Sequence, residues 1–123
     1  MTDIIDINQL KLLQQEFSQV RDWEKFHTPK NLAMALTCES AELLELFQWL
    51  SEDESRAAHE DPTLKEKTSQ ELADIMLYLI RIADLMKINL NEAIRNKIAH
   101  NNKKYPAERV KGSAKKYDEY FTD

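Results

Sequence analysis

Two short runs of acidic residues are the part of this sequence best suited to chemistry. The first run contains Glu39, Glu42 and Glu45, and the second contains Glu71 and Asp74. Residues three apart lie on one face of an α-helix, so each run would present its carboxylates together. Both runs interrupt apolar stretches, where a carboxylate is costly unless it is paired or binds a metal ion.

Carboxylate oxygens arranged in this way favour a hard divalent cation. Mg²⁺ commonly binds a few carboxylates together with the phosphate oxygens of a substrate, and Mn²⁺ accepts similar ligands. We therefore predict Mg²⁺ as the cofactor, with Mn²⁺ as a substitute, and these metal ligands: Glu39, Glu42, Glu71 and Asp74. The alternative is a solvated acidic surface, because 22 acidic residues also produce such spacings by chance.

The composition excludes several classes of protein. The chain has 123 residues, of which 42% are hydrophobic and 32% charged, as in a soluble globular domain. The single glycine, Gly112, excludes a glycine-rich phosphate-binding loop, and a net charge of −5 argues against nucleic-acid binding. One cysteine, an acidic N-terminus and the lack of a membrane-length apolar run predict a cytoplasmic protein without a membrane segment.

Helical periodicity, and no strand pattern, surrounds the acidic runs. The predicted helices cover about residues 7–25, 29–50, 64–87 and 90–104. Capping residues precede three of them: Asp6, Thr28 and Asn89. The polar residues 51–63 are predicted to form a loop, and residues from about 106 to 123 a polar tail. Long helices joined by short loops predict an all-α protomer of the four-helix-bundle type, with one domain over residues 1–123.

The ordered set of motifs resembles the MazG-like all-α NTP pyrophosphatases, and within them most nearly the dCTP pyrophosphatase group. Glu39-x-x-Glu42 is followed by Glu71-x-x-Asp74, with residues 43–70 between them. Further segments share the resemblance: residues 21–27, 42–49, 71–79 and 97–106. Together these segments extend over nearly the whole chain.

The resemblance implies an enzyme that hydrolyses a nucleoside triphosphate to the monophosphate and pyrophosphate. Mg²⁺ would clamp the triphosphate, neutralise its charge and activate the water that attacks the α-phosphorus. The catalytic carboxylates would be Glu39, Glu42 and Glu45, with either Glu39 or Glu45 accepting the proton of the water. The expected substrate is a pyrimidine dNTP such as dCTP or a modified dCTP. The expected role is removal of surplus or non-standard nucleotides from the cellular pool.

The resemblance also implies which residues hold the rest of the nucleotide. Phosphate contacts would come from Lys97, Asn101, Lys104 and Tyr105, and base contacts from Gln14, Trp23, Trp49 and Tyr78. Aromatic rings can stack on any base, so they contribute affinity more than selectivity. Gln14 departs from the histidine of the dCTP-preferring members, which puts a cytosine preference in doubt. Without the resemblance, core packing of the aromatics and a solvated helix end for the lysines would be the simpler interpretation.

Members of this family associate as dimers of dimers, so the resemblance implies a homodimer or homotetramer with a nucleotide substrate and no nucleic-acid or membrane partner. Two other hypotheses stay open. A non-catalytic helical interaction or regulatory module would use the acidic residues as a docking face. A di-metal redox bundle would need Glu-x-x-His on two helices, a pattern that the three histidines do not supply.

Overall fold

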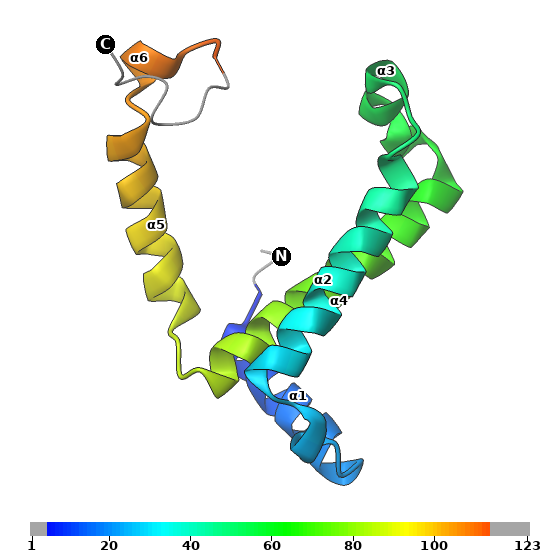
Figure 1. The fold of residues 1–123 in the computed structure, drawn as a ribbon, viewed down its shortest axis with the longest axis vertical. Helices are drawn as coiled ribbons and strands as arrows, with labels where there is room; N and C mark the ends of the chain where they lie inside the picture. The colour runs from blue at the N-terminus through cyan, green and yellow to red at the C-terminus, as the bar shows by residue number, and fades with distance from the viewer. Residues whose placement is uncertain (1–4, 114–123) are drawn as a thin grey trace. The chain divides into compact units, whose positions relative to one another are not determined.

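The computed structural model describes residues 5–113, and within this range the chain forms helices and turns without a strand. The helices in chain order are α1 (Ile7–Val20), the 3-10 helix η1 (Glu24–Phe26), α2 (Pro29–Phe47), α3 (Glu52–Arg56), the 3-10 helix η2 (Ala58–Glu60), α4 (Pro62–Leu85), α5 (Leu90–Lys104) and α6 (Ala107–Val110) (Figure 1). The all-α prediction is confirmed. None of the helices in residues 5–113 combines the length and apolarity that a membrane crossing requires.

Side-chain caps explain where the long helices begin. Asp6, Thr28 and Asn89 each accept a hydrogen bond from the backbone N–H three residues later, at 3.0, 3.1 and 3.1 Å. Such a cap satisfies one of the backbone donors that a helix start leaves unpaired. Helix α4 begins two residues before the predicted start near residue 64. Asp61 caps it, and Pro62 occupies the first helical position, which suits proline.

Three other boundaries differ from the prediction. The first helix ends at Val20 and not near residue 25, because Asp22 adopts a positive φ of 55° before the chain enters η1. Residues 51–63 are not a simple loop but contain α3 and η2. Ser51 and Glu54 form a reciprocal capping box that nucleates α3. The predicted polar tail contains the short helix α6, and its residues 114–123 lie outside the described range.

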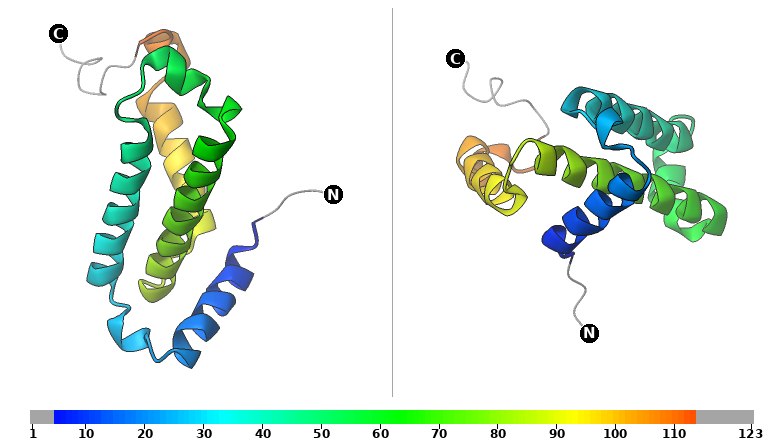
Figure 2. Two further views of the ribbon diagram at one scale, coloured as in Figure 1. Left: turned by 90° about the vertical axis from the view of Figure 1, so that its right-hand side faces the viewer. Right: turned by 90° about the horizontal axis from the view of Figure 1, so that it is seen from below.

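The chain divides into two compact units, one ending at Lys87 and the other beginning at Ile88. In the first unit, α2 and α4 run antiparallel and side by side, joined at one end through α3 and η2 (Figures 1 and 2). Helix α1 packs against α4. The second unit contains α5 followed by α6. A single domain over residues 1–123 stays a prediction.

The core of the first unit is thin. Its buried apolar side chains are Leu32, Ile80 and Ala83, and two polar side chains, Ser18 and Arg81, are buried beside them. Many large apolar side chains stay exposed on α1 and α4: Leu12, Leu13, Phe17, Val20, Leu72, Met76, Leu77 and Leu79. The first unit by itself therefore leaves apolar helix faces uncovered, which in proteins commonly marks an association surface.

Candidate functional site

An acidic cluster, which we define as Glu39, Glu42 and Glu71, forms where α2 and α4 pack together. One carboxylate oxygen from each side chain lies within 4.8 Å of the other two. Glu39 and Glu42 are neighbours because they are three apart on α2. The antiparallel packing of α4 then brings Glu71 to the same place. The structure thus assembles three of the four predicted metal ligands.

Two members of the acidic cluster, Glu39 and Glu42, have raised pKa values because of the carboxyl groups around them. The pKa of Glu39 is raised, first by its hydrogen bond with the Glu71 carboxyl group and then by burial. The pKa of Glu42 is raised by its hydrogen bond with Glu39 and then by the charge of Glu39. Like charges held this close favour retention of a proton unless a cation neutralises them.

Two oxygens of the acidic cluster have no hydrogen-bond partner among the described residues. They are Oε2 of Glu39 and Oε2 of Glu71, and both are buried. A buried carboxylate oxygen without a partner is costly, and a divalent cation would satisfy it. The donor set consists of hard oxygens, so these residues fit Mg²⁺ or Mn²⁺.

The remaining predicted acidic residues lie next to the cluster. Asp74 is exposed, and its charge is close enough to contribute to the raised pKa of Glu39. It lines the adjacent cavity and is not one of the three clustered side chains. Glu45 is exposed on the next turn of α2, and its charge likewise raises the pKa of Glu42.

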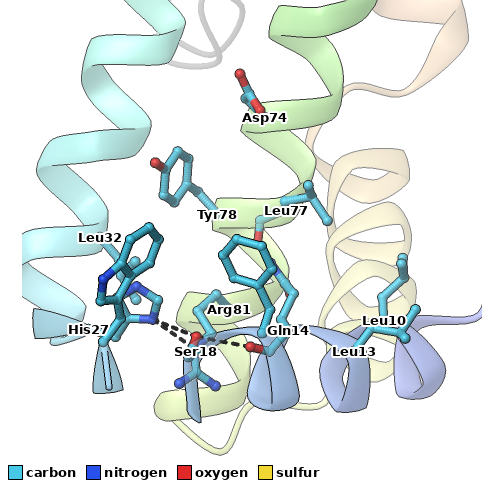
Figure 3. A pocket seen from close by; sticks show the side chains of 12 residues that line it. Leu10, Leu13, Gln14, Ser18, His27, Leu32, Asp74, Leu77, Tyr78 and Arg81 are labelled. Atoms are coloured by element: carbon cyan, nitrogen blue, oxygen red, sulfur yellow. Dashed lines mark hydrogen bonds between the residues drawn. The ribbon is translucent and has the colours of Figure 1, made fainter. Parts of the chain in front are cut away.

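A mostly apolar cavity of about 480 Å³ has Asp74 in its lining, which is one turn of α4 beyond Glu71 of the acidic cluster (Figure 3). Its apolar wall comes chiefly from α1 and α4: Leu10, Leu13, Phe17, Trp23, Leu32 and Leu77. Its polar lining consists of Gln14, Ser18, His27, Asp74, Tyr78 and Arg81. An apolar cavity with a few polar groups is typical of a small-molecule site, because the polar groups orient a ligand that the apolar walls desolvate.

Three of the four predicted base-binding residues line this cavity: Gln14, Trp23 and Tyr78. The Gln14 amide donates from Nε2 to the carbonyl oxygen of Leu77 at 2.8 Å, and its Oε1 is buried without a partner. The pKa of Tyr78 is raised by burial and then by the charges of Glu39 and Asp74. Trp49 lies beyond the end of α2, is 87% exposed and does not line the cavity.

A buried polar network that sequence reasoning missed closes one side of the cavity. We call Ser18, His27, Arg81 and Asp84 the Arg81 network. Nε of Arg81 lies 3.4 Å from Nδ1 of His27, Oγ of Ser18 lies 3.1 Å from the same nitrogen, and Nη1 of Arg81 donates to Asp84 at 3.1 Å. A signal existed, because Arg81 and Asp84 interrupt the apolar run of α4 at a spacing of three.

His27 also shows how a sequence pattern can mislead. Glu24 and His27 do have the Glu-x-x-His spacing, once in the chain, whereas a di-metal bundle needs it on two helices. They lie instead in η1 and at its C-terminal end, where His27 faces Ser18 and Arg81. The pKa of His27 is lowered, first by burial and then by the charge of Arg81. Both effects favour the neutral form of the ring.

The predicted phosphate-binding residues all belong to the second unit. Lys97 and Asn101 are exposed on α5, and Lys104 ends that helix. Tyr105 follows as the C-cap and donates its backbone N–H to the carbonyl oxygen of Asn101 at 2.8 Å. Positions 97, 101 and 104 share one face of the helix. Their contact with a substrate stays a prediction.

Comparisons with known proteins agree with this arrangement. A family described as MazG-like matches residues 34–120. The human protein named dCTP pyrophosphatase 1 is 36% identical over 113 residues, covering 92% of this chain and 66% of the human protein. The bovine protein of the same name is 38% identical over 111 residues, covering 90% and 66%. The chain therefore spans just under two thirds of the length of these relatives.

A solved structure extends the match to the fold. The crystal structure of a pyrophosphatase from Archaeoglobus fulgidus has a TM-score of 0.76 and 39% sequence identity, covering 86% of this chain and 97% of that chain. The family match includes both acidic runs, and the archaeal protein shares the helical arrangement that brings them together. This chain belongs to the MazG-like family.

Proposed function

We propose that this chain is a Mg²⁺-dependent nucleoside triphosphate pyrophosphohydrolase, which converts a (d)NTP and water into the (d)NMP and pyrophosphate. The observation that carries the proposal is the acidic cluster, with its two buried unpaired oxygens, beside an apolar cavity. The names of the human, bovine and archaeal relatives support the same reaction class. A metal site alone would suit many reactions, but a cavity sized for a base beside it suits a nucleotide.

The acidic residues have distinct roles in this proposal. Glu39, Glu42 and Glu71 hold the metal ion with Asp74 beside them, and the bound ion supplies charge neutralisation and water activation. A carboxylate accepts the proton of the attacking water. Glu39 and Glu45 are the two candidates: Glu39 belongs to the acidic cluster, and Glu45 lies on the next turn of α2, outside the cluster. The pH–rate profiles of Glu39→Gln and Glu45→Gln would identify the acceptor.

The proposed substrate is a pyrimidine deoxynucleotide such as dCTP or a modified dCTP, and the role is removal of surplus or non-standard nucleotides. The cavity would receive the base, with Trp23 and Tyr78 among its walls and Gln14 at its edge. Aromatic and apolar walls provide affinity, and the polar groups provide orientation. The triphosphate would extend towards the acidic cluster, with further contacts from Lys97, Asn101, Lys104 and Tyr105.

Release of pyrophosphate from a panel of nucleotides tests this proposal. The panel consists of the canonical NTPs and dNTPs with dUTP and 5-methyl-dCTP, each incubated with Mg²⁺. We expect equal amounts of monophosphate and pyrophosphate from one or a few pyrimidine deoxynucleotides, loss of activity with EDTA, and recovery with Mg²⁺ or Mn²⁺. A folded protein that releases no pyrophosphate from any nucleotide of the panel would instead support the non-catalytic interaction module.

We also propose that the chain associates with copies of itself, as a homodimer or homotetramer. The apolar side chains left exposed on α1 and α4, including Leu12 and Val20 at 66% and 72% exposure, support this proposal. Sedimentation equilibrium should give a mass of two or four times 14.4 kDa. A monomer at micromolar concentration would contradict it.

A further inference from the structure

We propose that Gln15 is a positioning residue for the ligand of the cavity. Through its hydrogen bond to Asp84 it holds α1 in place as one wall of that cavity, and it thereby sets the affinity for the ligand. The identity of the ligand rests on the proposed function. The seating of α1 on α4 is a property of the protein alone, so the two parts are tested separately.

Helix α1 supplies a large part of the cavity wall. Five of the residues that line the cavity belong to it: Leu10, Leu13, Gln14, Phe17 and Ser18. Figure 3 shows Leu10, Leu13, Gln14 and Ser18 along one side of the cavity. The shape of the cavity therefore depends on where α1 lies relative to α4.

Apolar packing by itself holds α1 only weakly. Among residues 7–20, Ser18 is the one fully buried residue. The large apolar side chains of the helix stay about half exposed or more: Leu12, Leu13, Phe17 and Val20. Because the hydrophobic contribution grows with the apolar area removed from water, these contacts contribute only part of what full burial would. A helix of this length is marginal by itself in water, so α1 depends on the contacts that fasten it.

Two glutamine side chains fasten α1 to α4. Nε2 of Gln14 donates to the carbonyl oxygen of Leu77 at 2.8 Å, and Nε2 of Gln15 donates to Oδ2 of Asp84 at 2.9 Å. Leu77 and Asp84 are two turns apart on α4, which corresponds to about 10 Å along the helix axis. Two attachments at this separation resist both sliding and rotation of α1 across α4, whereas one attachment would leave the helix free to pivot.

Asp84 is a firm anchor for Gln15 because its own position is fixed. Its Oδ2 also accepts from Nη1 of Arg81 at 3.1 Å, and its side chain is only 16% exposed. A hydrogen bond to a charged acceptor is stronger than one between neutral groups, and more so where water is largely excluded. The bond from Gln15 is therefore the stronger of the two attachments, since Gln14 donates to a neutral carbonyl group.

Gln15 acts on a ligand only through the position of α1. It belongs neither to the lining of the cavity nor to the acidic cluster. A ligand that needs the complete wall binds only those molecules in which α1 is seated, so its apparent dissociation constant rises as the seated fraction falls. We therefore expect the affinity for the ligand, and not the rate of the chemical step, to depend on Gln15.

Amide hydrogen exchange measures the seating of α1 in the free protein. Gln15→Met removes the amide donor and keeps an unbranched side chain of similar length. Exchange over residues 11–20 should become roughly threefold to tenfold faster in this variant, as the loss of one net hydrogen bond predicts. Gln19→Met is the matched control, because it makes the same change at an exposed position of α1, and it should leave exchange unchanged. Unchanged exchange in Gln15→Met would overturn the proposal, whatever the enzyme assays show.

The effect on the ligand is measured as a split between KM and kcat. For the preferred nucleotide, KM of Gln15→Met should rise at least roughly twofold, but by no more than the factor seen in exchange, because both report the same seating equilibrium. The value of kcat should stay within about twofold of the wild type. A variant that was only less folded would instead lose kcat at an unchanged KM, because fewer molecules would be active.

A double-mutant cycle tests whether Asp84 is the partner of Gln15. In the Asp84→Ala background, Gln15→Met should add no further change in KM or in the exchange of α1. If Asp84→Ala does not fold, Asp84→Asn provides a neutral acceptor of the same shape, and the effect of Gln15→Met should be smaller there. An effect of undiminished size in these backgrounds would overturn the assignment, since Gln15 would then act without Asp84.

Failure of the proposed function would be recognised separately. If the wild-type protein hydrolyses no nucleotide, calorimetric titration with α,β-methylene-dCTP and Mg²⁺ replaces the kinetic comparison, and the same loss of affinity is expected in Gln15→Met. Equal KM, or equal affinity for the analogue, in Gln15→Met and the wild type would overturn the role in ligand binding. A folded wild-type protein that does not bind the analogue would overturn that role too, and amide exchange would still decide whether Gln15 seats α1.

Discussion

Glu42→Gln lowers the rate of pyrophosphate release by roughly 100- to 1,000-fold, the range seen when one preorganised electrostatic contact to a transition state is removed. Glutamine keeps the shape of the side chain and one acceptor oxygen but loses the negative charge. The acidic cluster would then contain two carboxylates in place of three. The reacting centre would then have less negative charge with which to bind Mg²⁺, and the ion would hold the triphosphate less firmly.

The stability of the same variant distinguishes this explanation from unfolding. In the metal-free protein the neighbouring carboxyl groups raise the pKa of Glu39 and that of Glu42, so removal of one charge relieves repulsion. We therefore expect the metal-free Glu42→Gln protein to unfold at the same temperature as the wild type or higher. Its Tm should respond less to added Mg²⁺, because a ligand stabilises the folded state according to its affinity.

Glu16→Gln is the matched control, because it makes the same chemical change at an exposed position of α1. It should retain both turnover and the response of Tm to Mg²⁺. Wild-type turnover by Glu42→Gln, measured with the metal present, would remove the acidic cluster from the mechanism.

Asp84→Ala lowers the free energy of unfolding by about 3–5 kcal/mol, the usual cost of leaving one partner of a buried ion pair without its counter-charge. The side chains of Arg81 and Asp84 are only 6% and 16% exposed, and their atoms are 3.1 Å apart. Without Asp84, the guanidinium would stay buried with its charge uncompensated, and Gln15 would lose its acceptor. Urea unfolding at neutral pH measures the difference.

An exposed ion pair in the same protein provides the comparison. Arg56 and Asp53 are also three apart and 3.1 Å from each other, but their side chains are 73% and 97% exposed. Asp53→Ala should cost about 0–1 kcal/mol, because water screens and replaces such a pair. Similar losses in the two variants would show that burial of the Arg81 network contributes no stability. Replacement of both Arg81 and Asp84 by apolar residues should recover part of the loss.

The helices and their starts were predictable because their causes lie within a few residues. The side chains of Asp6, Thr28 and Asn89 each accept a hydrogen bond from the backbone N–H three residues later. Local signals also had limits. The polar composition of residues 51–63 predicted a loop, but the capping box at the start of α3 makes part of this segment helical. The end of α1 depends on the positive φ of Asp22, which the periodicity of the helix does not show.

The pairing of the acidic runs was predictable in part. Spacing placed Glu39 beside Glu42, and the interruption of apolar stretches indicated that Glu71 should face inward. The crossing of α2 and α4 decided that Glu71 joins the acidic cluster whereas Asp74, one turn away, lines the cavity. Spacing along one helix cannot distinguish these two outcomes, because they depend on how the second helix is rotated about its axis.

The sequence by itself determined the helical class, the helix caps, the acidic motifs and membership of the MazG-like family. The tertiary structure alone decided which side chains meet across the cavity. Arg81 is 54 residues from His27, and Gln14 is 63 residues from the carbonyl group that holds its amide. Local patterns follow from backbone hydrogen bonding within a turn or two. Contacts between distant residues follow only when the packed helices fix the direction of each side chain.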